Sequence, residues 1–302
     1  MNYIIGVDGG GTKTEAAAYS LEDKELCKGY SGFGNLILDW NQAVSNIIDS
    51  IEKCIRSINH KGEQGKCLCI YLGLAGIEAN HNKERIEKVL KEKFLCEVQA
   101  LNDADIAHAA MLKGEDGIMT ISGTGSISYG LYKGQKSRTG GWGHILGDEG
   151  SGYFIALQAF KRMILEEDSV LAKSELTKAI MSKLNINKVN DIKGFIYSAS
   201  KGEIAGYAPI VVKLAEASEI NSINILKRAG KDLAIMTEKL YKKLGIKQPI
   251  NIGIKGSILT EVDIVREEFI SYLQMNLKGI TIIKEDISST KGACYLYRTL
   301  MK

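Results

Sequence analysis

Two glycine-rich turns, each set between apolar strand-like segments, constrain the fold of this chain more than any other feature. The first follows an apolar segment at 2–7, where DGGGTKTE turns the chain into two further strand-like segments, EAAAYS and ELCKGYS. The second lies in GIMTISGTGSISYGLY at 117–132. Both patterns predict a strand, a tight glycine turn and a returning strand. We therefore interpret the second segment as an internal duplication of the first.

Neither turn has the form of a common nucleotide-binding loop. A dinucleotide-binding fingerprint needs a helix straight after its glycines, whereas the first turn leads into a strand-like segment. The sequence also contains no GxxxxGK[ST] loop. These two classes of nucleotide site are therefore excluded.

Helix and strand patterns alternate between the two hairpins. Apolar residues recur at intervals of three and four over 43–58, which predicts an amphipathic helix. A strand at 67–74, a helix around 86–94, a strand at 96–101 and a short helix from Asp103 are predicted to follow. Alternation of this kind indicates an α/β layer architecture.

The rest of the chain has mostly helical patterns. Helices are predicted at roughly 151–166, 174–184, 202–218 and 222–244, one strand at 250–255, and a closing helix from about Ser289. A length of 302 residues suits two domains. Because no low-complexity linker occurs, the predicted boundary near residue 112 rests on the repeated hairpin alone.

Composition excludes several classes of function. Lys and Arg number 39 against 36 Asp and Glu, and this balance has no basic stripe, so nucleic acid is not an expected partner. Six irregularly spaced cysteines, without a CxxC pair, predict reduced core thiols, and Cys67 and Cys69 are expected on one face of a buried strand. The sequence shows neither a signal-peptide core nor a membrane-spanning apolar run. The expected location is the cytoplasm.

The first turn offers groups that bind phosphate. The glycines at 9–11 allow the backbone to approach a polyanion closely, and Thr12 and Thr14 add hydroxyl and amide donors. Asp8, at the strand end, is a candidate to hold Mg²⁺ through water. Taken alone, the pattern fits an ordinary hairpin equally well.

The second turn strengthens the phosphate interpretation. Thr124 and Ser126 alternate with glycines directly after the apolar strand at 118–121, which suits another phosphate or a reacting hydroxyl. Phosphoryl transfer depends mainly on positioning and charge neutralisation. Two such turns and a metal-holding acid supply much of what that reaction requires.

Asp103 lies between the two hairpins, after a strand and at the start of a short helix. One interpretation is a helix N-cap, a role that strand-end aspartates often have. The other is a general base that takes the proton of an attacking hydroxyl. Asp105, in the first turn, is expected to compensate the helix dipole.

The segment GGWGHILGDEGSG at 140–152 is the densest in glycine, with six in thirteen positions. Such a loop costs too much backbone entropy to serve only as a connection. Asp148 and Glu149 suit a solvated acidic turn, or they accept hydrogen bonds from sugar hydroxyls beside the flat face of Trp142. His144 is not accompanied by other residues in a metal-binding pattern, so a structural role is expected for it.

Taken in order, DGGGTKT, NDA, SGTGS and GGWGHILGDEGSG resemble the motifs of the N-acetylglucosamine kinase family, in the actin-like sugar kinase superfamily. The resemblance continues through Ala205-Gly206, the segment 253–257 and Lys291-Gly292-Ala293, so it spans nearly the whole chain. It implies an α/β, two-lobed actin-like ATPase (ribonuclease H-like) fold with an interlobe cleft. The implied lobes are 1–112 plus 289–302, and 113–288.

The resemblance also implies an activity. The family transfers phosphate from ATP, with Mg²⁺, to the 6-hydroxyl of an N-acetylated amino sugar, and Asp103 would be its general base here. The sugar would be N-acetylglucosamine, N-acetylmuramic acid or, in some bacterial members, glucosamine. A cytoplasmic homodimer with no nucleic-acid or membrane partner is implied.

The carried-over site residues fall into three groups. ATP contacts are implied for Gly10, Gly11, Thr12, Lys13, Thr124, Ala205, Gly206, Gly256 and Ser257. Sugar contacts are implied for Asn35, Asp103, Ser126, Gly140, Gly141, Trp142 and Asp148, and a magnesium contact for Asp8. Lys255 departs from the family, which more often has a small or apolar residue at this position.

Two other classes of protein share the hairpins. An activator ATPase of acyl-CoA dehydratases or reductases holds an iron–sulfur cluster between subunits, for which Cys96 and Cys294 are the candidates here. A sugar sensor without catalysis would keep the nucleotide turns only as relics, yet both turns retain their hydroxyl residues. The kinase is therefore the favoured interpretation.

Overall fold

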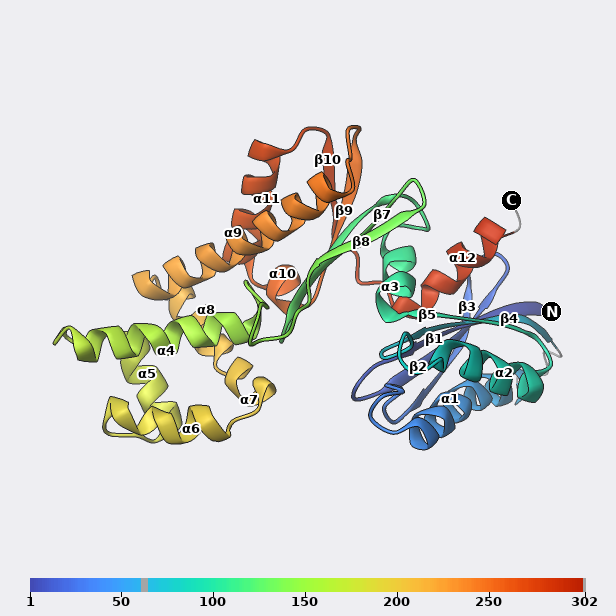
Figure 1. Cartoon of the computed structure of the whole chain (residues 1–302), viewed down its shortest axis with the longest axis horizontal. Coiled ribbons are helices and arrows are strands. Elements are labelled where there is room, and N and C mark those ends of the chain that lie inside the picture. The colour runs from blue at the N-terminus through green and yellow to red at the C-terminus, as the bar shows by residue number, and fades with distance from the viewer. Residues whose placement is uncertain (61–64, 301–302) are drawn as a thin grey trace. The chain divides into compact units, whose positions relative to one another are not determined.

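The chain forms two compact units. In the computed structural model, which describes residues 1–60 and 65–300, unit 1 comprises Met1–Glu115 with Glu285–Lys302, and unit 2 comprises Asp116–Lys284. Figure 1 labels the elements of each unit. Among the described residues no helix is long and apolar enough to cross a membrane.

Unit 1 is built on a five-stranded sheet with the order β3-β2-β1-β4-β5. Its strands are β1 (Asn2–Gly9), β2 (Thr14–Ser20), β3 (Glu25–Ser31), β4 (Lys66–Leu74) and β5 (Glu97–Asn102). The first three strands are antiparallel, whereas β1, β4 and β5 run parallel. The carboxyl ends of the three parallel strands therefore share one edge of the sheet.

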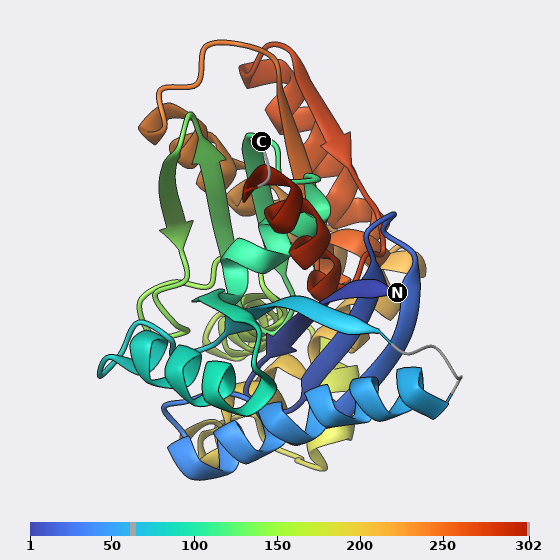
Figure 2. The same ribbon diagram turned by 90° about the vertical axis from the view of Figure 1, so that its right-hand side faces the viewer.

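Helices cover both faces of this sheet. They are α1 (Trp40–His60), α2 (Asn82–Phe94), α3 (Asp103–Met111) and α12 (Gly292–Leu300), the last preceded by the 3₁₀ turn η2 (Ser289–Lys291). One core joins α1 and α2 to the sheet, and a second joins α3 and α12 to its other face. Figure 2 shows α1 and α2 together on one side of these strands and α12 on the other.

The expectation that Cys67 and Cys69 share one face is wrong. Tyr3 pairs with Cys67 and the next residue, Ile4, pairs with Cys69, so β4 contains a bulge at this point. The extra residue reverses the alternation of side chains. Cys67 packs against the core of α1 and α2, and Cys69 belongs to the core of α3 and α12.

Unit 2 repeats the sheet topology of unit 1. Its strands are β6 (Gly117–Ser122), β7 (Ser126–Tyr132), β8 (Gln135–Gly140), β9 (Ile250–Lys255) and β10 (Ile280–Ile283). The order is β10-β9-β6-β7-β8, with β6, β7 and β8 antiparallel and β6, β9 and β10 parallel. In each unit, the first strand is central, the next two extend the sheet on one side and the last two extend it on the other. The interpretation of a duplicated hairpin is confirmed.

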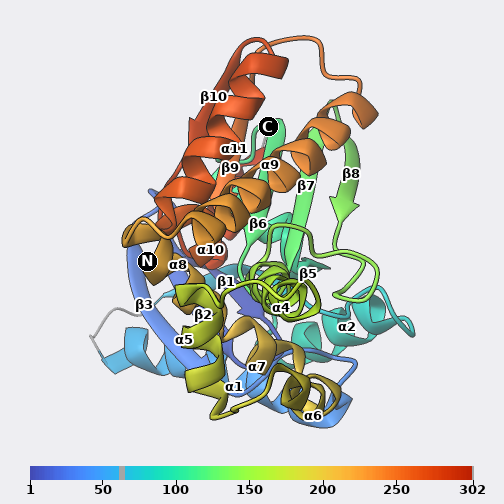
Figure 3. The same ribbon diagram turned by 90° about the vertical axis from the view of Figure 1, so that its left-hand side faces the viewer.

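The remaining helices belong to unit 2. They are α4 (Gly152–Asp168), α5 (Glu175–Leu184), α6 (Ile192–Ser198), α7 (Lys201–Ala205), α8 (Ala208–Glu216), α9 (Ile220–Lys243), α10 (Ser257–Glu261) and α11 (Asp263–Asn276), with a 3₁₀ turn η1 (Val189–Asp191). Figure 3 shows α9 and α11 side by side over the sheet. The helix predicted at 202–218 is broken at Gly206 and Tyr207, where α8 starts anew with Pro209 in its first turn.

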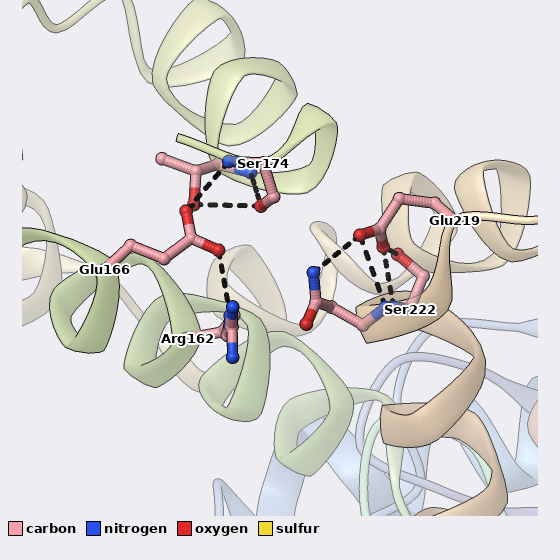
Figure 4. Close-up of polar contacts among 7 residues, drawn as sticks. Arg162, Glu166, Ser174, Glu219 and Ser222 are labelled. Atoms are coloured by element: carbon pink, nitrogen blue, oxygen red, sulfur yellow. Dashed lines mark hydrogen bonds and ion pairs between the residues drawn. The ribbon is translucent and has the colours of Figure 1, made fainter. Parts of the chain in front are cut away.

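A buried carboxylate joins α4 to α5 (Figure 4). Glu166, 1% exposed, accepts hydrogen bonds from Thr177 Oγ1 (2.7 Å), Ser174 N (2.9 Å) and Arg162 Nε (2.8 Å). Burial acts to raise the pKa of this carboxyl group, but these donors outweigh it and lower the pKa to about 2. The ionised form of Glu166 therefore stabilises the helical part of unit 2.

We expect Glu166→Gln to lower the free energy of unfolding by about 3 kcal/mol at pH 7, because the pKa falls from 4.5 to about 2 on folding. A lowered pKa contributes stability above the unfolded value, and this contribution disappears as the pH falls from about 4.5 towards 2. Urea denaturation at several pH values measures the difference. The neighbouring exposed Glu167→Gln is the control. A loss that does not change with pH, or that Glu167→Gln matches, would contradict this account.

Candidate functional site

The shared strand edge of unit 1 gathers three of the segments singled out from sequence. Gly9 of β1 is in register with Leu74 of β4, which is in register with Asn102 of β5. The first glycine turn, the segment after β4 and the start of α3 therefore leave the sheet side by side. Ala75 N donates to Gly9 O at 3.0 Å, which joins two of these segments directly.

The first turn lies against the loop that carries Asn35. A Cβ added to Gly34 would lie 2.7 Å from the Cα of Gly9, so the two backbones touch and neither position has room for a side chain. Gly34 N donates to Gly10 O at 2.9 Å. Asn35 is thereby held beside the turn, and its carboxamide nitrogen has no hydrogen-bond partner among the described residues.

Two threonines of this turn have different roles. Thr14 is buried and its hydroxyl donates to Gly32 O at 2.8 Å, so this side chain holds the turn to the neighbouring loop. Thr12 is exposed, and the amides of Gly11 and Thr12 make no hydrogen bond within the described part of the chain. The donors of Gly11 and Thr12 are thus available to an anion. Lys13 is exposed beside them, with its ammonium 3.9 Å from Glu15.

Asp103 is the first residue of α3, but it is not the N-cap. Asn102 has that position, and its side chain accepts from Ala104 N at 3.0 Å. Asp103 Oδ1 accepts from the same amide at 2.9 Å. Burial is the main cause that raises the pKa of the Asp103 carboxyl above its ordinary range; hydrogen bonds from the backbone amides of Ala104 and Asp103 act against it, and the charges of Asp105 and Glu78 add to it. A carboxylate with a raised pKa is a stronger base. The structure thus leaves Asp103 suited to proton transfer.

Asp8 lies at the end of β1, half-buried and opposite Glu15 of β2. Among the described residues no group of three or more His, Cys, Asp or Glu side chains is arranged to hold a metal ion. Mg²⁺ does not require such a group, because it takes one or two carboxylates and completes its shell with water and phosphate oxygens. The residues present therefore fit a magnesium ion bound together with a nucleotide.

In unit 2, the second glycine turn brings together the residues expected to contact ATP. Gly152 N, at the start of α4, donates to Gly123 O at 2.7 Å, and a Cβ added to Gly152 would lie 3.7 Å from the Cβ of Ala205. Gly256, with a φ of +87°, lies so close to Ser122 that a Cβ would meet its carbonyl oxygen at 2.3 Å. Segments near 152, 205 and 256 thus surround this turn.

The tip of the second turn has free hydrogen-bond donors. Thr124 is exposed, and within the described residues the amides of Thr124 and Gly125 make no hydrogen bond. Gly206 and Ser257, at the two neighbouring segments, are exposed as well. Two adjacent amides without a backbone partner, together with a hydroxyl, are a donor set that suits phosphate oxygens. Lys255, the departure from the family pattern, ends β9 opposite Ile121.

Ser126 connects the second turn to the glycine-rich loop. Its backbone nitrogen donates to Asp148 Oδ1 at 3.1 Å, its hydroxyl donates to Glu149 O at 2.7 Å, and its carbonyl oxygen accepts from Gly141 N at 3.1 Å. Ser126 is buried, so these bonds hold Gly141 and Asp148 at the start of β7. Gly140 has a φ of +70° and lies against Met236, which excludes a side chain there.

Asp148 is a buried carboxylate whose Oδ2 is paired with a lysine. The residue is 3% exposed, and Lys201 Nζ lies 2.6 Å from Oδ2. A carboxylate oxygen has two lone pairs, so Oδ2 can also accept from a ligand hydroxyl. Lys201 was not predicted from the sequence, because its partner is remote in the chain and no motif contains the lysine.

The aromatic residues of the loop differ in exposure. Trp142 is 65% exposed, and the guanidinium of Arg138 lies 4.9 Å from the centre of its ring. His144 makes an edge contact with Tyr153, with ring centres 4.9 Å apart, in keeping with the structural role expected for it. Of these two side chains, Trp142 is thus the one open to solvent, with Arg138 against its ring.

Comparisons with known proteins agree with this chemistry. The chain is 30% identical over 305 residues to an N-acetylmuramic acid/N-acetylglucosamine kinase from Clostridium acetobutylicum, with 99% of each covered. It is 27% identical to an N-acetyl-D-glucosamine kinase from Dictyostelium discoideum, with 97% of each covered.

Solved structures show the fold. A protein from Chromobacterium violaceum assigned as an N-acetylglucosamine kinase matches with a TM-score of 0.76 at 22% identity, covering 97% of this chain and 98% of that one. The ROK hexokinase from Thermus thermophilus matches with a TM-score of 0.61 at 17% identity, with 98% of each covered. The expected α/β, two-lobed actin-like fold is confirmed. A family model of the BadF/BadG/BcrA/BcrD ATPases matches residues 5–294, and the chain therefore belongs to the BadF/BadG/BcrA/BcrD ATPase family.

Proposed function

We propose that this protein transfers the terminal phosphate of ATP to the 6-hydroxyl of an N-acetylated amino sugar, N-acetylglucosamine or N-acetylmuramic acid. The observation that carries the proposal is Asp103, a carboxylate of raised pKa that directly follows the N-cap residue Asn102 at the carboxyl end of β5. The relative from Clostridium acetobutylicum, matched over its whole length, supports this substrate class.

Each unit contributes its own groups to the reaction. In unit 1, Asp103 accepts the proton of the sugar hydroxyl, Asn35 offers its amide to the sugar, and the amides of Gly11 and Thr12 bind phosphate oxygens. In unit 2, Thr124 and Gly125 bind phosphate oxygens, and Asp148 Oδ2 accepts from a sugar hydroxyl. When bound near Asp8, Mg²⁺ supplies positive charge to the phosphates.

An activator ATPase is the alternative from the same family. Its iron–sulfur cluster requires accessible cysteines close together. Cys294 is 1% exposed in the core of α3 and α12, whereas Cys96 packs against the core on the opposite face of the sheet. This separation disfavours a cluster held by the two residues. Glucosamine remains the alternative sugar, and we propose a cytoplasmic homodimer on the family resemblance.

Purified protein with Mg-ATP should release ADP with N-acetylglucosamine or N-acetylmuramic acid and poorly with glucose. The acetamido group is the expected basis, since the glycine-rich loop carries both an exposed indole, Trp142, and a hydroxyl acceptor, Asp148. A coupled assay over a panel of sugars, with glucosamine included, measures the ratio of kcat/KM values. Preference for glucose, or ADP release that no sugar stimulates, would contradict the proposal.

Asp103→Asn should lower kcat by roughly a hundred- to ten-thousand-fold with little change in sugar affinity, as removal of a general base does. Because the base must be ionised and its pKa is raised, wild-type activity should be lost on acidification at a pH above the ordinary aspartate value of about 4. Asp105→Asn, in the same helical turn, is the matched control. Near-normal kcat in Asp103→Asn would remove this residue from the mechanism.

Thr124→Val should raise the KM for ATP or lower kcat by about tenfold, because it removes an exposed hydroxyl beside two free amides. Thr281→Val, an exposed threonine on β10 of the same unit, should do neither. Steady-state kinetics with thermal midpoints separates the two. Equal effects of the two substitutions would show that only general stability had changed.

A further inference from the structure

Lys201 forms a close ion pair from a helix position at which a cation is unfavourable. It is the first residue of α7, where Ser200 and Glu203 form a capping box. A cation at a helix start opposes the helix dipole, which favours acidic residues there. Its Nζ lies 2.6 Å from Asp148 Oδ2, and the lysine and aspartate side chains are 31% and 4% exposed. The contact with Asp148, rather than the stability of α7, therefore explains why a lysine occupies this position.

The ammonium group of Lys201 lies directly against the second glycine turn. A Cβ added to Gly125 would lie 2.6 Å from Lys201 Nζ and 3.0 Å from Asp148 Oδ1. Gly125 is also one of the two residues in this turn whose amides are free within the described structure. A phosphate held by those amides would have the ammonium as its neighbour.

The ion pair uses one of the donors of Lys201. At 2.6 Å from Asp148 Oδ2, the ammonium group directs one N–H at that oxygen. An ammonium group has three N–H donors, so two remain. Because about a third of the side chain is exposed, these two donors can point towards an incoming anion while the first stays on the carboxylate. Lys201 is thus a preorganised cation beside free amides.

We propose that Lys201 binds the terminal phosphate of ATP, an inference that rests on the proposed kinase function and adds a residue to it. As the bond from the sugar O6 to phosphorus forms, the bond from phosphorus to the bridging oxygen breaks and ADP leaves with the electron pair. The hydroxyl proton passes to Asp103. Lys201 donates to the equatorial oxygens of the phosphoryl group and neutralises their charge, while Asp148 fixes the position of the ammonium.

The test compares two nucleotides that differ in the terminal phosphate, in the absence of sugar. By isothermal titration calorimetry with Mg²⁺, Lys201→Gln should bind AMP-PNP about ten- to a hundredfold more weakly, whereas ADP affinity should change less than about threefold. Lys201→Arg should retain most of the AMP-PNP affinity, and the exposed Lys193→Gln should behave as wild type. Equal losses for both nucleotides, or no loss, would overturn the proposal.

A double variant separates phosphate binding from simple charge balance. Lys201→Gln alone leaves the Asp148 carboxylate buried without its counter-ion, which destabilises proteins and repels anions. In Lys201→Gln/Asp148→Asn both charges are absent, and the AMP-PNP loss should persist. Recovery of AMP-PNP affinity would instead mean that Lys201 only neutralises Asp148. If wild-type protein binds ADP and AMP-PNP but phosphorylates no sugar, the kinase proposal fails while the phosphate contact stands.

Discussion

Direct backbone contact at glycine positions is the constraint on which both units depend. A Cβ at Gly6 would lie 1.9 Å from Thr290 O, so η2 can lie on β1 only because residue 6 has no side chain. Likewise, a Cβ added to Gly230 of α9 would lie 2.4 Å from Val265 O of α11. The same direct backbone contact occurs in the candidate site, between Gly34 and Gly9. Close backbone approach therefore fixes both the packing of the units and the position of their turns.

A duplicated topology explains why glycine turns of the same kind occur twice, and divergence explains why the two units have different chemistry. Each sheet begins with a hairpin whose tip has amides without a partner among the described residues, at Gly11 and Thr12 in unit 1 and at Thr124 and Gly125 in unit 2. In unit 1, the parallel strand β5 is followed by an acid of raised pKa, Asp103. In unit 2, the third strand leads into the long glycine-rich loop that holds Asp148.

Sequence predicted most, but not all, of the elements that have an apolar period. The strand at 250–255 was predicted with its observed bounds, and α1, α4 and α9 were found within a few residues. The helix α11 was missed although Val265, Phe269 and Leu273 give it an apolar period, and the short apolar strand β10 was missed as well. The polar strand β8 was missed, because its residues QKSRTG pair through the backbone at the sheet edge without an apolar alternation. Bulges and remote ion pairs, as at Cys67 and Lys201, depend on tertiary contacts that leave no local pattern.

The most direct test of the central claim is the structure of the reaction product. Phosphorus–proton correlation NMR on a completed reaction with Mg-ATP and N-acetylglucosamine shows which carbon carries the phosphate. We expect coupling of phosphorus to the two protons on C6, since Asp103 is proposed to deprotonate the 6-hydroxyl. Coupling to the anomeric proton, or free phosphate with no phosphorylated sugar, would contradict it.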